Sequence, residues 1–272
     1  MKFFLYGYYT KNNFGDFLIT LSLLKLLKVH APDAHIFVYW YDSLVPPPLQ
    51  ENPRVNIVRR PANFKDLLTL LKVLLCVDVV IVGGGQKYRW SMKSGLAPQY
   101  IIPCLSKILG KRLLFLSVGI EPGDLLWASL VKNLFNAADG VSVRDLISFH
   151  YLKSIGVSCV PSSDLVFYYI MNYCGQLNSL KKMYGRIKHR LIKNVGLAIR
   201  CSEITDDLLT YYFPDLIEKL ARNYTVVLLP ATSGDLAMYR RILNQIPSSI
   251  KQKVVIEENL DYVHIIKVLA QL

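Results

Sequence analysis

The sequence predicts an α/β protein with two Rossmann-like domains whose sheets are mostly parallel. Short apolar segments, several of them rich in β-branched residues, alternate with longer segments in which leucine recurs at helical spacing. Glycine, proline or a polar residue follows several of the apolar segments, where a parallel strand would turn toward its crossover helix. The alternation stops once, at a basic stretch, and then starts again. This pattern indicates two successive domains with sheets covered on both faces.

The first domain is expected to occupy residues 1–170. Its strands are expected at 3–8, 35–40, 55–60, 79–82, 113–118, 140–143 and 158–161, and its helices at 16–29, 64–75, 97–109, 124–137 and 145–155. The run LLTLLKVLLCVDVVIVGGG approaches the length of a membrane span, but Lys72 and Asp78 interrupt it and helical leucines give way to β-branched residues. A helix followed by a buried strand accounts for this run better.

A basic linker is expected at 171–193, because no acidic residue occurs from Leu165 to Ser202 while lysines and arginines crowd the middle. These cations either form a solvated surface between domains or contact phosphates or lipid headgroups. The second domain is expected at 194–272. Its strands are expected at 195–199, 225–229 and 254–256, and its helices at 206–222, 234–246 and from Asp261. No strand follows the last helix, so we expect this domain to be incomplete at its C-terminus.

The composition indicates a globular protein with a marked positive charge. Hydrophobic residues make up 52% of the 272 positions, enough for a sizeable core. Lys and Arg total 32 against 20 Asp and Glu, and the net charge of +12 favours phosphates, nucleic acid or an anionic membrane face as partners. Nucleic acid is the least favoured of these, because aromatic residues do not interleave with the basic stretch.

Cysteine usage and the N-terminus indicate a cytoplasmic protein. The five cysteines are scattered and form no pair at metal-ligand spacing, so we expect reduced thiols and no metal site. The first apolar stretch is too short for a signal peptide and lacks a small-residue cleavage site. The basic stretch leaves open a peripheral contact with the inner face of the cell membrane.

Two strand ends in the first half could build a ligand crevice. The stretch FLYGYYTKNNFGDFLIT passes from a strand through a turn into a helix, and it places Asp16 at the mouth of the crevice that parallel sheets form at their carboxyl ends. Gly83, Gly84 and Gly85 end a buried strand. These glycines either let a ligand approach closely or simply allow a tight turn.

Two later strand ends carry charged residues. Arg144 follows an apolar strand and either binds a carboxylate or phosphate or pairs with Asp145, which is also placed to cap the next helix. Asp164 could cap a helix, pair with Arg144 or contact sugar hydroxyls. Sequence reasoning leaves these alternatives open.

Five motifs, taken in order, resemble those of the polysaccharide pyruvyl transferase family. They are Y-G-Y-Y-x-x-x-N-F-G-D at 6–16, D-V-V-I-V-G-G-G at 78–85, S-V-G-I-E-P at 117–122, V-S-V-R-D-x-x-S at 141–148 and S-D-L-V-F at 163–167. Each motif is weakly specific alone, and their shared order carries the resemblance. More loosely, LAIR and the later VVLLPATSGD look like the opening of the family's second domain.

The resemblance implies a fold similar to GT-B glycosyltransferases. It also implies transfer of a pyruvyl group from phosphoenolpyruvate to a sugar of a cell-wall or extracellular polysaccharide, forming a cyclic ketal. Asp16 becomes a candidate active-site carboxylate, able to act as a base toward the sugar hydroxyl, and Arg144 a candidate donor-binding arginine. The candidates for substrate binding are Asn13, Gly15, Gly83, Gly84, Gly85, Gly119 and Asp164. Phosphoenolpyruvate would be the donor, a sugar or lipid-linked glycan the acceptor, and no cofactor or metal is expected.

Two features depart from the family's pattern. The sequence has Val-Gly-Ile-Glu-Pro at 118–122 where the family usually shows Q-G-I-G-P, so Glu121 adds a carboxylate near an anionic donor. The family's Arg-Leu-His motif, expected after the last helix, is absent. We therefore expect either a fragment of a longer enzyme or a degenerate relative. Half a parallel sheet would expose an edge and an apolar face, so we expect the isolated chain to be poorly soluble or oligomeric.

Two other functions fit the same residues. One is a sugar-nucleotide-dependent glycosyltransferase of GT-B-like architecture, which would bind a nucleoside diphosphate and not phosphoenolpyruvate. The other is a non-catalytic, truncated paralogue that binds glycan precursors or membrane through the basic stretch.

Overall fold

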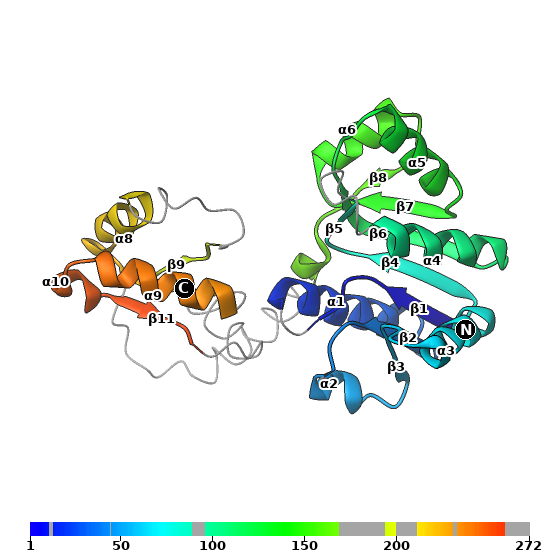
Figure 1. Ribbon diagram of the computed structural model, residues 1–272, viewed down its shortest axis with the longest axis horizontal. Helices are drawn as coiled ribbons and strands as arrows, with labels where there is room; N and C mark the ends of the chain where they lie inside the picture. Colours follow the sequence, from blue (N-terminus) through cyan, green and yellow to red (C-terminus); the bar gives the residue numbers. More distant parts are fainter. Residues whose placement is uncertain are drawn as a thin grey trace. The chain divides into compact units, whose positions relative to one another are not determined.

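A computed structural model of the chain describes residues 1–10, 13–43, 45–88, 96–168, 194–199, 211–230 and 233–258. The chain divides into two compact units. The first comprises Met1–Lys11 and Gly15–Met171, and the second comprises Asn12–Phe14 and Asn172–Leu272. Figure 1 labels the helices and strands of each unit.

The first unit is built on an eight-stranded parallel sheet. Its strands are β1 (Lys2–Tyr6), β2 (His35–Trp40), β3 (Val55–Arg59), β4 (Val79–Gly83), β5 (Gln86–Tyr88), β6 (Arg112–Ile120), β7 (Gly140–Val143) and β8 (Val160–Pro161). The order across the sheet is β3-β2-β1-β4-β6-β7-β8, and β5 pairs with β6 off this path. From β1 the chain adds β2 and β3 on one side and then β4, β6, β7 and β8 on the other, so the strand order switches between β1 and β4. Open α/β sheets form their ligand crevice at such a switch point.

Helices connect these strands, and several begin at side-chain caps. They are α1 (Phe14–His30), α2 (Pro47–Gln50), α3 (Phe64–Cys76), α4 (Leu96–Ile108), α5 (Leu125–Asn136) and α6 (Leu146–Ser154). Asn63 caps α3 and Asp124 caps α5. Asp145 caps α6 by accepting a hydrogen bond from the Ser148 N–H at 2.7 Å, which confirms the expected cap. Each cap satisfies an N–H group that the first helical turn leaves without a helical partner.

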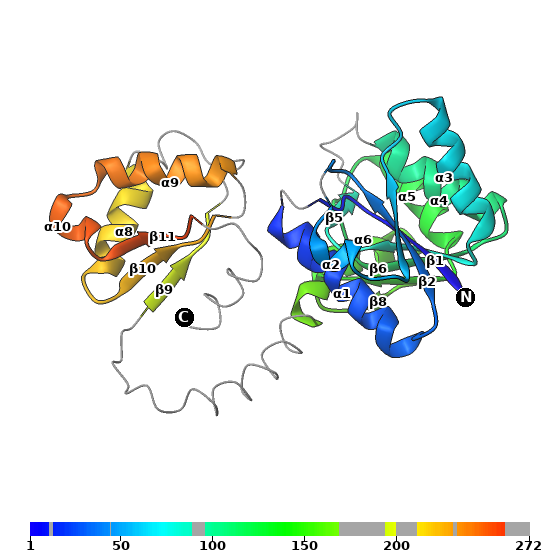
Figure 2. The same ribbon diagram turned by 90° about the horizontal axis from the view of Figure 1, so that it is seen from below.

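The sheet is buried on both faces at its centre. On one face Phe4 and Val80 of the strands pack in a common core with Leu74 of α3 and Trp127 of α5. On the other face α1 lies against β4 through Leu23. Figure 2 shows α3 and α4 on one side of the strands and α1 on the other. This double burial explains why β1 and β4 are almost continuously apolar instead of alternating.

The second unit holds a smaller parallel sheet. Its elements are β9 (Asn194–Leu197), α8 (Phe213–Ala221), β10 (Thr225–Leu228), α9 (Ser233–Gln245), α10 (Ser248–Lys251) and β11 (Val254–Ile256), with strand order β11-β10-β9. Tyr239 lies in the core beside Ile217 and Val226, and its hydroxyl accepts a hydrogen bond from the Ile199 N–H at 2.6 Å. Burial raises the pKa of Tyr239 to about 12, so the phenol is neutral at physiological pH.

The structure corrects some of the expected strand bounds. The first strand ends at Tyr6 and not at residue 8, and beyond it the Tyr9 hydroxyl donates to Gly83 O at 3.2 Å. Only Val160–Pro161 of the strand expected at 158–161 is extended in the sheet. The sequence pattern does not predict β5, because Gln-Lys-Tyr contains no apolar run.

Several expectations fall outside the described residues. These are the basic linker at 171–193, the start of the helix expected at 206–222 and the helix expected from Asp261. The apolar run near residue 75 forms α3 and then β4, as expected. Among the described helices, none is both long and apolar enough to cross a membrane.

Candidate active site at the carboxyl ends of the parallel strands

The turn between β1 and α1 carries Gly15 and Asp16 to the carboxyl edge of the sheet, whereas Asn13 is grouped with the second unit. Asp16 lies in the first turn of α1, where the helix N–H groups favour a negative charge. The buried Tyr9 hydroxyl ties this turn to β4 by donating to Gly83 O. Burial raises the pKa of Tyr9, and the Asp16 carboxylate raises it further, so Asp16 acts electrostatically on this phenol.

Two of the three glycines at the end of β4 lie against α1. A Cβ at Gly83 would stand 2.6 Å from Leu23 Cδ1, and one at Gly84 would stand 2.3 Å from Ile19 Cγ2. Gly84 and Gly85 also have positive φ, 63° and 75°, a conformation that glycine adopts without steric cost. The tight-turn alternative therefore accounts for Gly83 and Gly84. The substrate-binding role predicted for the three glycines stays a prediction.

The backbone of β6 is irregular at Ser117. Its φ is 52°, and the pairing register of β6 with β7 shifts at the same point. The Ser117 N–H donates to Ser142 Oγ at 2.9 Å, while the Ser117 hydroxyl donates to Ser163 O at 2.7 Å and lies 2.9 Å from Ser162 Oγ. These bonds hold the left-handed residue in place and join the carboxyl ends of β6, β7 and β8.

Sequence reasoning does not select these serines. A serine occurs near the end of each strand, in FLSVGI, GVSVRD and PSSD. Serine is common in strands and turns, so one such residue carries little information. The strand order reveals the pattern, because it makes the three serine-bearing ends neighbours at one edge.

Beyond this bulge, the end of β6 joins the glycine turn. The Gly119 N–H donates to Gly85 O at 2.8 Å. Glu121, where the sequence departs from the family pattern, follows directly, and its backbone oxygen accepts a hydrogen bond from Trp127 Nε1 at 2.8 Å. The loops after β4 and β6 therefore form one connected surface.

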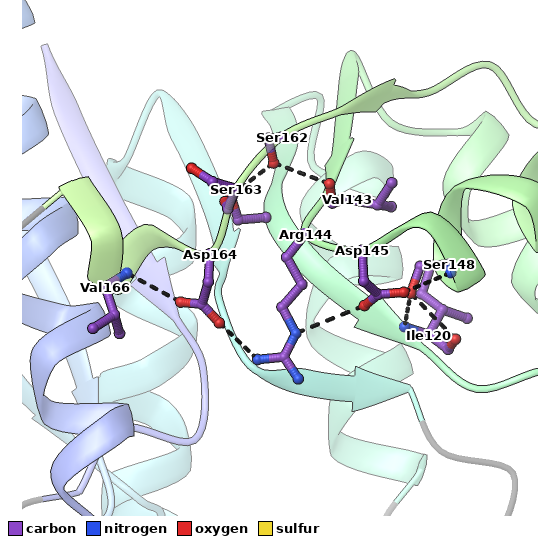
Figure 3. A network of polar contacts seen from close by, with 10 residues as sticks. Ile120, Val143, Arg144, Asp145, Ser148, Ser162, Ser163, Asp164 and Val166 are labelled. Atoms are coloured by element: carbon purple, nitrogen blue, oxygen red, sulfur yellow. Dashed lines mark hydrogen bonds and ion pairs between the residues drawn. The ribbon is translucent and has the colours of Figure 1, made fainter. Parts of the chain in front are cut away.

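Arg144 follows β7 and is held by two carboxylates. Its Nη1 lies 2.8 Å from Asp164 Oδ2 and its Nε lies 3.8 Å from Asp145 Oδ2. The other Asp164 oxygen accepts a hydrogen bond from the Val166 N–H at 3.0 Å. Figure 3 shows the guanidinium between the two carboxylates. Ion pairing with both aspartates is therefore confirmed, yet the Arg144 side chain stays 26% exposed and within reach of a ligand.

The predicted residues lie on one edge of the sheet, in two groups. Asp16 stands beside the switch point between β1 and β4, whereas Arg144 and Asp164 stand at the ends of β7 and β8. Three strand spacings separate β1 from β7, which is about 14 Å. The loops that carry Gly83, Gly85 and Gly119 lie between the two groups. A ligand that contacts both groups must extend across these glycines.

A cavity of about 360 Å³ lies at the opposite edge of the sheet. Asn136, Asp139 and Cys159 are among its lining residues, and they precede β7 and β8. The cavity is therefore separate from the residues described above. In the described part of the chain, no cluster of three or more His, Cys, Asp or Glu side chains could hold a metal ion.

The strand order and the parallel pairing define a Rossmann-like α/β protein, with the charged residues at the carboxyl edge of its sheet. A solved UDP-N-acetylglucosamine 2-epimerase from Rickettsia bellii shares this fold, with a TM-score of 0.52 and 10% identity over 97% of this chain and 71% of that chain. The ADP-heptose lipopolysaccharide heptosyltransferase II of E. coli aligns with a TM-score of 0.45 and 17% identity, over 98% of this chain and 76% of that chain. The predicted fold class is confirmed. No curated protein matches the chain.

The family follows from the sequence match. Residues 13–270 match the family described as polysaccharide pyruvyl transferase, nearly the whole chain. The chain belongs to this family, and the resemblance seen in the five motifs is confirmed. The match continues beyond residue 167, where the fifth motif ends, into the second unit.

Proposed function

We propose that this protein transfers a pyruvyl group from phosphoenolpyruvate to a sugar of a cell-wall or extracellular polysaccharide, forming a pyruvate ketal. The observation that carries the proposal is Arg144, a partly exposed guanidinium at the carboxyl edge of the sheet in a member of this family. Phosphoenolpyruvate carries a carboxylate and a phosphate, and a guanidinium binds both groups through paired hydrogen bonds.

Arg144 would bind the donor while its own ion pairs stay in place. A guanidinium has five N–H donors, and Asp164 and Asp145 engage Nη1 and Nε. We assign Nη2 to the carboxylate or phosphate of the donor. The two aspartates fix the orientation of the guanidinium before the donor arrives, which lowers the entropy lost on binding. Asp164 is in this proposal a positioning residue.

The proposed reaction consumes one phosphoenolpyruvate and two sugar hydroxyls. One hydroxyl adds to the enol carbon, and the methylene carbon takes a proton and becomes a methyl group. The second hydroxyl then displaces phosphate from the same carbon and closes the ketal, and its proton leaves with inorganic phosphate. We propose Asp16 as the base for the first hydroxyl. No resident cofactor is needed, because the donor carries its own leaving group.

Binding of phosphoenolpyruvate to the full chain, measured by calorimetry, tests the proposal. Arg144→Ala should weaken binding about 10- to 100-fold, because hydrogen bonds to charged groups contribute about 1.5–3 kcal/mol. Arg54→Ala is the matched control. Arg54 pairs with Asp33 at 3.5 Å and precedes β3, at the amino edge of the sheet, so its loss should leave binding unchanged.

Two outcomes would contradict the proposal. Unchanged binding in Arg144→Ala would remove the donor-binding role of this residue. Tight binding of a nucleoside diphosphate, with no response to phosphoenolpyruvate, would favour a sugar-nucleotide-dependent glycosyltransferase instead.

We also propose that the acceptor is a sugar or lipid-linked glycan met at the inner face of the cell membrane. The support is the net charge of +12 and the basic stretch at 171–193, which suit an anionic lipid surface. Reduced sedimentation of the full chain with anionic vesicles after neutralising the lysines and arginines of this stretch would support the contact, and unchanged sedimentation would contradict it.

A further inference from the structure

An exposed tyrosine ring stacks on a second tyrosine at the carboxyl edge of β1 and β2. Tyr8 follows β1 and is 55% exposed, although it is a large aromatic residue. Its ring centroid lies 4.2 Å from that of Tyr41, which follows β2, and the two ring planes differ by 39°. We call this pair the tyrosine platform.

The strand register positions the platform. β1 and β2 pair in parallel with Leu5 opposite Val38, and this register brings the residues after the two strands side by side. The pairing continues past the strand ends, because the Tyr41 N–H donates to Tyr9 O at 3.0 Å.

Buried aromatic rings support the platform from below. Tyr41 contacts Tyr39 with centroids 5.3 Å apart, Tyr39 contacts Tyr6 at 5.1 Å, and Tyr6 contacts Phe4 at 6.2 Å. Burial raises the pKa of Tyr39 to about 12 and also raises the pKa of Tyr41, so both rings are neutral. A supported pair of neutral rings is a rigid surface that loses little entropy when a ligand binds.

One cationic group contacts the platform. The Arg60 guanidinium carbon lies 5.5 Å from the Tyr41 ring centroid. The hydroxyl of the buried Thr10 donates to Asp42 Oδ2 at 2.5 Å. Thr10 and Asp42 follow Tyr9 and Tyr41 directly along the chain. Carboxylate and guanidinium groups are able to recognise sugar hydroxyls at the rim of an aromatic surface.

We propose that the tyrosine platform binds a pyranose ring of the acceptor glycan, an inference that rests on the proposed function. One face of a pyranose presents C–H bonds with a partial positive charge, whereas the face of an aromatic ring is negative, so the two faces attract each other. Asp16, the proposed base, lies eight residues after Tyr8 along the chain, in the first turn of α1. A sugar stacked on Tyr8 would thus hold the glycan at the same carboxyl edge of the sheet as the proposed base.

The experiment titrates the full chain with methyl glucopyranoside, methyl galactopyranoside and methyl mannopyranoside, followed by saturation-transfer NMR. The wild type should bind at least one of these probes. Tyr8→Ala should weaken that binding about five- to tenfold, and Tyr8→Phe, which keeps the ring, should stay within about twofold of the wild type. The control is Tyr211→Ala, because Tyr211 is a tyrosine of the second unit that is even more exposed than Tyr8, at 74% against 55%.

Three results would overturn the platform proposal. They are no detectable binding of any probe, equal binding by the wild type and Tyr8→Ala, and displacement of the sugar by uridine monophosphate, which would assign the platform to a nucleoside. Phosphoenolpyruvate binding in the same variants separates this proposal from the proposed function. Tyr8→Ala with normal donor binding and weakened sugar binding supports both. If sugar binding depends on Tyr8 but the protein does not bind phosphoenolpyruvate, the platform proposal is supported and phosphoenolpyruvate is rejected as the donor.

Discussion

The left-handed backbone at Ser117 predicts that glycine is more stable than alanine at this position, the reverse of an ordinary strand. In a strand interior glycine is less stable than alanine by about 0.5–1 kcal/mol. With φ at 52°, however, any Cβ at position 117 costs about 1–2 kcal/mol, and glycine avoids this cost. Both substitutions lose the buried hydrogen bond to Ser163 O, at about 1–3 kcal/mol. The lost hydrogen bond is common to both variants and cancels. Glycine gains the strain energy of the Cβ and loses the smaller cost of glycine in a strand, so Ser117→Gly should have a free energy of unfolding about 1 kcal/mol higher than Ser117→Ala.

Urea unfolding followed by tryptophan fluorescence measures this difference in the right part of the molecule. Trp40, Trp90 and Trp127 all belong to the first unit, so the signal reports the unfolding of that unit. The matched control is Ser142 in β7, where Ser142→Gly should be less stable than Ser142→Ala by about 0.5–1 kcal/mol. The reasoning is refuted if Ser117→Gly falls below Ser117→Ala in the same way as the Ser142 pair.

Two further predictions concern the packing of α1 and the electrostatics of β6. Gly84→Ala should lower the free energy of unfolding by about 2–4 kcal/mol, because φ is positive and the new Cβ meets Ile19. The control is Gly110→Ala, which also has a positive φ but has nothing within 4 Å of the new Cβ, so it should lower the free energy of unfolding by only about 1 kcal/mol. Equal losses in the two urea curves would contradict the proposed clash. A hydrogen bond from a β6 N–H and the neighbouring Lys107 lower the pKa of Asp139 from 3.8. The Asp139 carboxylate therefore stabilises the folded state above pH 3.8, and this stabilisation is lost as the pH falls through the lower pKa of the folded state. Asp139→Asn should therefore flatten the acid limb of a stability-against-pH curve, and an unchanged limb would show that Asp139 does not contribute.

Hydrophobic periodicity predicts an element correctly when burial alone selects the residue type at each of its positions. The strands at 35–40, 140–143 and 254–256 begin and end where the sequence predicts, because each is a short apolar or β-branched run between turn residues. The five motifs identify the family for the same reason, since each lies at or next to the carboxyl end of a strand. Placement of Asp16 and Arg144 on one edge then follows from the rule for parallel sheets.

Features that depend on contacts between strands cannot be predicted from the periodicity of one segment. Serine carries no mark of a positive φ, so the bulge at Ser117 cannot be predicted from FLSVGI. Sequence reasoning offers Asp145, Asp164 or a bound ligand as the partner of Arg144, and the strand order β7-β8 explains why Asp164 lies at 2.8 Å. The contact between Tyr8 and Tyr41 follows from their matching positions beyond two neighbouring strands. Predicting it requires the pairing register of β1 with β2 as well as the positions of the two strands.

The proline in β8 has a consequence for the behaviour of the protein in a crowded cell. N–H groups alternate in direction along a strand, and the Ser162 N–H donates inward to Val143 O at 2.8 Å, so the N–H at position 161 would point away from the sheet. Pro161 has no N–H to offer there. A strand from another molecule would find no donor at this position and could not extend the hydrogen-bond ladder past it. This side of the sheet is therefore protected against the strand-by-strand growth that produces fibres.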